Sequence, residues 1–166
     1  MSNLEDRVAR TPRPSLPLPL LQGAGGLGVN TPLDGLDLSG QDLTSASFTK
    51  AQMKGTNLSD ADLRGVSLFA CDAVGAKLDR ADLSGASVEL GNFNGASLKD
   101  TVLEGAFVTS STFARADLTG SDWTDVLLRA DLKKSLCDNP TADGVNARTR
   151  VDTRESLGCA GPAPQK

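Results

Sequence analysis

Apolar residues recur at every fifth position of the chain between residues 31 and 130. Read in fives from Thr31, this segment contains twenty consecutive units without a shift in phase. The third position is Leu in twelve units, the first is most often Ala, and the fifth is Gly in nine. Polar residues fill most second and fourth positions. An internal repeat of this extent indicates a repetitive architecture in place of an ordinary globular core.

A period of five excludes both regular secondary structures. On an α-helix, five residues advance about 500°, so the apolar position would drift around the axis. On a β-strand, an odd period sends successive apolar side chains to opposite faces. The pattern therefore predicts a chain that turns a corner once per repeat. Gly at the fifth position supplies the backbone freedom that such a corner needs.

The units at 61–65 (ADLRG), 81–85 (ADLSG) and 116–120 (ADLTG) resemble the consensus of the pentapeptide-repeat family. The resemblance implies an all-β fold, a right-handed quadrilateral β-helix with twenty residues per turn and about five coils here. In that register the third positions form four columns. These are Leu38, Leu58, Leu78, Leu98 and Leu118; Leu43, Leu63, Leu83, Leu103 and Trp123; Leu33, Met53, Ala73, Phe93 and Phe113; and Phe48, Leu68, Val88, Val108 and Leu128.

Three segments follow from this pattern. Residues 1–30 form a Pro/Gly-rich N-terminal tail and cap, with four apolar residues that could cover the first coil: Leu20, Leu21, Leu27 and Val29. The Pro-rich part is either a flexible tail or an extended arm that orders on a partner. Residues 31–130 form the β-helix. Residues 131–166 form a C-terminal helical cap, in which Asp152 and Gly158 have the spacing of helix start and stop signals.

Three cysteines divide between the repeats and the tail. Cys71 occupies an inward first position and is expected to be a buried thiol. Cys137 and Cys159 could form a disulfide that closes a loop of 22 residues, worth about 3 kcal/mol on the chain-entropy model. Zinc is a weaker interpretation because there is no His and only two thiols can meet. A disulfide favours an oxidising compartment.

The segment from DLKKSLC (131–137) to DTRESLGC (152–159) carries a second resemblance. It is similar to the C-terminal cap of pentapeptide-repeat proteins from cyanobacteria and plant thylakoid lumens, in which two cysteines pair. The resemblance implies a mature lumenal protein whose targeting peptide is absent from this sequence. The polar start, Met1 to Arg10, has no signal-peptide core, and no apolar run approaches the roughly 20 residues of a membrane-spanning helix.

The composition argues against catalysis. Without His, a Ser-His-Asp or Cys-His arrangement is impossible, and no phosphate-binding glycine loop occurs. We therefore expect no catalytic residue, no cofactor and no metal. One acidic stripe arises at second positions on a single face: Asp42, Asp62, Asp82 and Asp122, interrupted by Val102. These carboxylates either bond their own backbone or offer a weak cation or contact site.

One face of the predicted rod carries outward apolar residues: Phe69, Leu90, Phe107 and Leu127. Four such residues on one side of a small rod suggest a contact patch for a protein partner. The alternative is that one of the chain's own tails covers them.

Two functions remain open. The first is a non-enzymatic scaffold, an auxiliary lumenal subunit or assembly factor that binds a protein partner such as a photosynthetic thylakoid complex. The second is a DNA mimic that protects DNA gyrase. Net charge is −4 and the pI about 4.8, which argues against binding nucleic acid itself. The repeats hold 14 acidic and 8 basic residues, and this mixture of signs weighs against mimicry of DNA.

Overall fold

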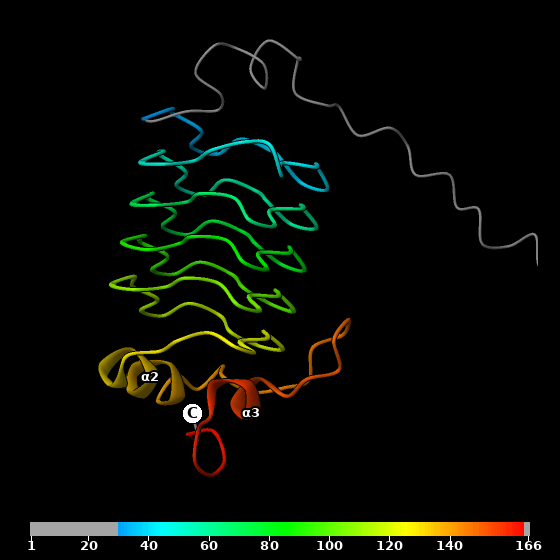
Figure 1. Ribbon diagram of the computed structural model, residues 1–166, viewed down its shortest axis with the longest axis vertical. Helices are drawn as coiled ribbons and strands as arrows, with labels where there is room; N and C mark the ends of the chain where they lie inside the picture. The colour runs from blue at the N-terminus through cyan, green and yellow to red at the C-terminus, as the bar shows by residue number, and fades with distance from the viewer. Residues whose placement is uncertain (1–29, 165–166) are drawn as a thin grey trace, which may run out of the picture.

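The structure, a computed structural model, describes residues 30–164. Isolated parallel β-bridges connect each second position to the residue twenty positions later, from Pro32 with Gln52 to Val102 with Asp122. The chain therefore winds into a stacked solenoid with four repeats per turn (Figure 1). The proposed N-terminal cap residues Leu20, Leu21, Leu27 and Val29 lie outside the described residues.

Backbone hydrogen bonds explain how a five-residue repeat makes this shape. The N–H of the first position donates to the third-position carbonyl of the preceding repeat, as Ala81 does to Leu78 at 2.9 Å. This bond closes a tight turn at each corner. The third- and fifth-position N–H groups donate to the next coil, as Leu83 does to Val102 at 2.7 Å and Gly85 to Glu104 at 2.9 Å. Each repeat thus supplies one turn and one short rung of a parallel ladder.

The corners use a left-handed backbone at the fifth position. Gly65 has φ 68° there, as glycine readily allows. Side chains occupy the same conformation at other corners, including Ala70 at φ 56° and Arg80 at φ 60°. The repeat therefore imposes the turn even where the residue disfavours it, because the ladder bonds on both sides fix the corner.

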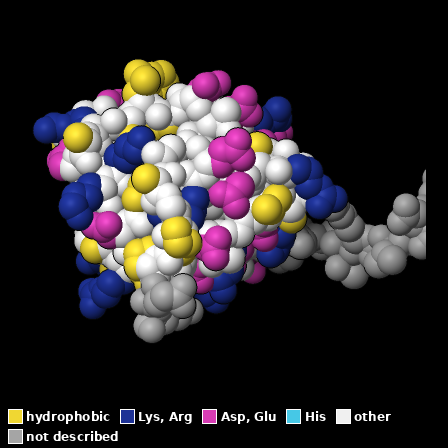
Figure 2. Space-filling view, turned by 90° about the horizontal axis from the view of Figure 1, so that it is seen from below, with side chains coloured by type: hydrophobic (Ala, Val, Ile, Leu, Met, Phe, Trp, Pro, Cys, Tyr) yellow, Lys and Arg dark blue, Asp and Glu magenta, His cyan; other side chains and the backbone are white. Residues whose placement is uncertain are grey.

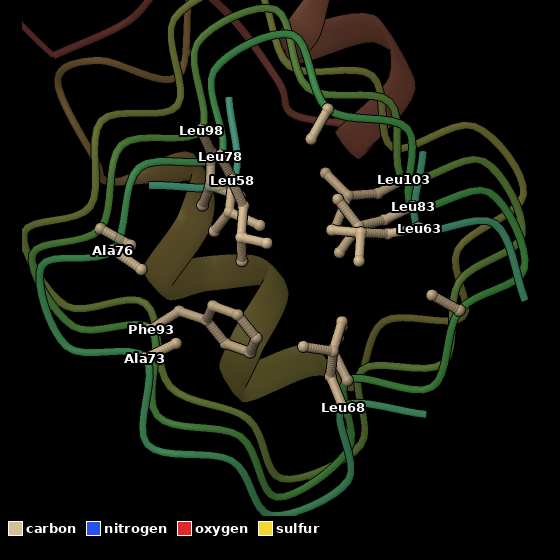
Figure 3. Packing of buried hydrophobic residues seen from close by; sticks show 14 of the residues in the cluster. Leu58, Leu63, Leu68, Ala73, Ala76, Leu78, Leu83, Phe93, Leu98 and Leu103 are labelled. Atoms are coloured by element: carbon tan, nitrogen blue, oxygen red, sulfur yellow. The ribbon is translucent and has the colours of Figure 1, made fainter. Parts of the chain in front are cut away.

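The core is a narrow column of stacked side chains. Figure 3 looks along the axis and shows Leu58, Leu78 and Leu98 in one stack, and Leu63, Leu83 and Leu103 in another (Figure 3). All of these are buried.

Aromatic rings fill the end of the core nearest the C-terminus. Phe93 stacks on Phe113 with centroids 5.4 Å apart, and Phe113 meets Trp123 edge to face at 5.3 Å. The Trp123 Nε1–H donates to the Ser121 hydroxyl at 2.7 Å, so its only polar atom is satisfied.

The regular ladder ends before the last predicted repeat. Residues 126–129 form no β-bridge, and helix α2 (Ala130–Cys137) begins directly after them. Helix α3 (Thr153–Leu157) follows, with the Asp152 carboxylate accepting from the Glu155 N–H and Gly158 ending it in the left-handed conformation. Both helices lie beneath the last coil (Figure 1). A disulfide joins Cys137 and Cys159, whose Cα atoms are 5.6 Å apart.

Candidate interaction surface

The outward apolar residues occupy one face of the rod, the face built on the column from Phe48 to Val108. We call Phe69, Leu90, Phe107 and Leu127 the apolar face. Leu90 is 53% exposed, Phe107 56% and Leu127 88%, whereas Phe69 is partly buried. Each belongs to a different turn of the solenoid, so together they run along its length.

The position of each residue within its repeat decides its exposure. Phe107 occupies a second position, where the ladder places Ser67 and Ser87 in the coils before it. Second-position side chains point away from the core, so a phenyl ring there remains in solvent. Leu90 occupies a left-handed corner with φ 56°, which also directs its side chain outward.

The apolar face ends where the ladder opens. Phe107 pairs with Ser87, but Leu127 makes no bridge to Phe107, because the chain leaves the coil to enter α2. A groove of about 440 Å³ lies at this opening, lined by Val108, Ser110, Phe113, Leu127 and Leu132, among others.

A second groove of about 650 Å³ continues past Phe113 and lies between Ala114–Ala116 of the last coil and α2. We call the two together the basal groove. Its α2 wall carries Asp131, Lys134 and Asp138, of which Lys134 and Asp138 form an ion pair. The end of the molecule that holds α2 and α3 shows positive and negative side chains together (Figure 2).

The structure places the predicted acidic stripe on one ladder but does not leave it as a free row of carboxylates. Asp42 accepts from the Thr44 N–H at 3.1 Å and hydroxyl at 2.7 Å. Asp62 takes a bidentate bond from Arg64, at 2.8 and 2.6 Å. Asp122 is buried and accepts from both the N–H and hydroxyl of Thr124.

These contacts lower the pKa of two carboxyl groups of the stripe. The Thr44 hydroxyl lowers the pKa of Asp42, and the Arg64 guanidinium lowers that of Asp62. The Arg148 guanidinium lies 3.6 Å from Asp82. The lowered pKa keeps Asp42 and Asp62 ionised at neutral pH, and Asp62 and Asp82 each lie beside a guanidinium. Among residues 30–164, no group of three or more Cys, Asp or Glu side chains could hold a metal ion.

Side chains of the C-terminal segment form the hydrogen bonds to the last coil that a further coil would otherwise supply. The Leu118 N–H donates to the Thr141 hydroxyl at 2.9 Å, and the Trp123 N–H to the Ser156 hydroxyl at 3.0 Å. Asn139 Nδ2 donates to the Ala116 carbonyl and Asn146 Nδ2 to the Gly120 carbonyl, both at 2.8 Å. Sequence reasoning did not single out these residues, because their partners are distant in the sequence.

Arg154 organises this cap from a nearly buried position. Its guanidinium donates to the carbonyls of Gly161 at 2.8 Å, Cys137 at 3.1 Å, Ala160 at 3.3 Å and Ala142 at 3.4 Å. The Cys137 carbonyl lies at the C-terminal end of α2, where a positive charge is favourable. One side chain therefore connects α2, α3 and the disulfide. The DTR sequence in the cap resemblance was the only signal of this role.

No helix among residues 30–164 has the length and apolarity needed to cross a membrane.

Known proteins share this architecture and part of this sequence. A crystal structure of a pentapeptide repeat protein from the Arabidopsis thaliana thylakoid lumen has a TM-score of 0.76 and 40% identity, covering 79% of this chain and 90% of that one. The thylakoid lumenal 15 kDa protein 1, chloroplastic, of Arabidopsis thaliana is 46% identical over 50 residues. That match spans 30% of this chain and 21% of the relative's length.

A family model is also matched. Eight copies of a model described as pentapeptide repeats cover residues 30–60, 61–89 and 92–129. These ranges coincide with the bridged coils and end where the chain turns into α2. The chain belongs to the pentapeptide repeat family.

Proposed function

We propose that this protein is a non-enzymatic interaction protein of the thylakoid lumen, which binds a protein partner through the apolar face. Its finer role is that of an auxiliary subunit or assembly factor of a photosynthetic membrane complex. The observation that carries the location is the similarity to a thylakoid-lumen protein over most of both chains. The disulfide between Cys137 and Cys159 is consistent with an oxidising compartment.

The apolar face supports the binding role. Leu90, Phe107 and Leu127 are all more than half exposed. The third-position side chains of the first two repeats, Val88 and Val108, are buried, and Leu128 beside Leu127 is partly buried. Exposed apolar side chains of this size gain free energy when a partner removes them from water, at about 25 cal/mol per Å². Large exposed apolar residues along one side of a solenoid fit a partner that lies lengthwise against it.

The charge pattern favours a partner protein over a surface that imitates DNA. Acidic side chains of successive coils are paired with basic ones, such as Asp60 with Arg80 at 2.8 Å and Asp72 with Lys54 at 3.2 Å. A DNA mimic needs an extended field of one sign, which these pairs interrupt.

The decisive experiment is a pull-down from thylakoid lumen and solubilised membranes, comparing Leu90→Glu with the unchanged protein. We expect Leu90→Glu to lose most of the captured partner, because it places a charge in an apolar contact. Val74→Glu is the matched control, since Val74 is an exposed apolar residue on a neighbouring face.

Equal capture by all three proteins would contradict binding through the apolar face. Recovery of DNA gyrase subunits in place of lumenal proteins would favour the DNA mimic. Circular dichroism of each variant checks that the solenoid is intact.

A further inference from the structure

The basal groove is lined by residues whose backbone N–H groups lack the bonds that the same positions make in the rest of the solenoid. In complete coils, third- and fifth-position N–H groups donate to the following coil, as those of Val88 and Leu90 do to Phe107 and Thr109. Within residues 30–164, the corresponding N–H groups of Val108, Ser110, Phe113 and Arg115 have no hydrogen-bond partner. All four residues line the basal groove.

The C-terminal cap forms hydrogen bonds to one part of the edge of the last coil and leaves the neighbouring part without them. It supplies acceptors to Leu118, Gly120 and Trp123, through Thr141, Asp143 and Ser156. At Phe113 and Arg115, α2 stands away from the coil and leaves a groove of about 650 Å³. An open sheet edge beside such a groove is a site for an added extended strand.

The N-terminal segment starts from the correct corner to reach this edge. Asn30 has the left-handed φ of 65° found at Lys50, Ala70, Leu90 and Ser110, which occupy the same corner in successive coils. With about 4.8 Å per coil, the path from Asn30 to the groove below Ser110 is roughly 24 Å. The ten residue steps from Leu20 to Asn30 span up to about 33 Å when extended, so the segment is long enough.

The sequence Leu16–Pro17–Leu18–Pro19–Leu20 matches what this edge requires. In an extended strand, alternate residues direct their N–H and C=O groups to the same side. The leucines would offer both groups to the solenoid, and the prolines would fall where an N–H points away. Proline is tolerated in edge strands at such positions and blocks the addition of a further strand.

We propose that the 16–20 segment of the N-terminal arm docks in the basal groove of its own chain as an added edge strand. Its carbonyls accept from the free N–H pair of one face, Val108 with Ser110 or Phe113 with Arg115. Docking of the arm goes beyond the proposed function. The docked arm would compete with a protein partner at Leu127, the lower end of the apolar face.

Amide hydrogen exchange of the full-length protein without a partner, resolved by NMR, tests the docking. We expect at least one of the two N–H pairs to exchange about tenfold or more slowly than in a variant with Leu16→Asp, Leu18→Asp and Leu20→Asp. The matched control places the same three charges upstream, by Ser2→Asp, Asn3→Asp and Leu4→Asp, and should keep the protection. The Leu83 amide, bonded to Val102, reports that the coils stay folded.

Equal exchange of both pairs in the unchanged protein and the 16–20 variant would overturn the proposal. Protection that disappears on dilution would also overturn it, because a second copy would then be the occupant. Protection that is independent of concentration and lost only in the 16–20 variant supports docking within one chain. Because no partner is present, this result is separate from the pull-down that tests the apolar face.

Discussion

Single residues adjust to a backbone that the repeat has already fixed. Gly91 shows this most clearly, since it occupies a first position where Ala is usual. A Cβ there would lie 2.5 Å from Cε2 of Phe93 and 2.7 Å from the Val88 carbonyl oxygen. The missing side chain therefore makes room for a large ring within a narrow core. Cys71 and Ser111 occupy the equivalent position in neighbouring coils.

Replacing Gly91 by Ala should destabilise the protein by about 1 to 3 kcal/mol, because the added methyl overpacks the core. Urea unfolding followed by circular dichroism measures this loss. Combining Gly91→Ala with Phe93→Leu should recover part of it, since the smaller side chain removes the ring contact. An unchanged unfolding free energy for Gly91→Ala would contradict the packing described.

Cys71 gives a prediction for the dependence on pH. Burial, with a smaller contribution from Asp72, raises the pKa of its thiol from 9.0 to about 12. The raised pKa means that the buried neutral thiol is fully compatible with folding below pH 9. Stability is lost as pH rises above 9, because only the unfolded chain then ionises this group.

The stability advantage of the unchanged protein over Cys71→Ala should therefore be about 1.4 kcal/mol smaller at pH 10 than at pH 7. Urea unfolding of both proteins at the two pH values tests this, and comparison of the pair cancels the titration of lysines. A difference that does not change with pH would show that the thiol ionises in the folded protein.

At the scale of elements, the two short helices depend on contacts outside themselves. Helix α2 has eight residues and α3 five, too few to be stable alone in water. The Asp152 carboxylate caps α3, and Arg154 bonds the carbonyl at the end of α2. The cap is therefore stabilised mainly by the contacts of Arg154 with its neighbours, and little by the intrinsic stability of the two helices.

Arg154→Met should lower the unfolding free energy by about 2 to 3 kcal/mol, because it keeps an apolar stem but leaves buried carbonyls without their charged donor. Thermal unfolding would measure the loss. Arg148→Met is the control: the Arg148 side chain is exposed and paired with Asp82 at 3.6 Å, so its loss should cost less than about 1 kcal/mol. Equal effects of the two substitutions would contradict the role of Arg154.

The whole molecule is a stack in which each coil contacts only its neighbours. The stability of the solenoid therefore depends on how its two ends are covered. At the C-terminal end, the disulfide closes a 22-residue loop that contains Arg154, Asn146 and Thr141. These are the residues that bond to the last coil or hold the helices together. A covalent link across this loop therefore stabilises the end of the ladder as well as the cap.

The double variant Cys137→Ser and Cys159→Ser should lose about 3 kcal/mol of unfolding free energy, since the unfolded chain regains the freedom of the closed loop. Denaturation with and without a reducing agent provides the comparison, and the reductant should leave the double variant unaffected. If reduction left the unchanged protein as stable as before, the disulfide would not be stabilising the cap.

The repeat made the solenoid predictable, and the reason is physical. A five-residue period has one regular solution, so the columns through Leu78 and Leu83 and the glycine corners followed from the sequence. Pairing across twenty residues agrees with that register. The outward position of Leu90, Phe107 and Leu127 also followed from their place in the repeat, whereas Phe69 is partly buried.

Tertiary structure decided what the period does not encode. Residues 126–130 keep the repeat pattern in sequence but leave the ladder, because α2 begins there and its packing competes with the last rung. Asn139, Thr141, Asn146 and Arg154 bond to partners that no local pattern identifies. The basal groove exists only because α2 diverges from the last coil. Sequence by itself determined the repeating rod, whose contacts recur at fixed spacing, while its ends depend on single long-range contacts that only the folded chain brings together.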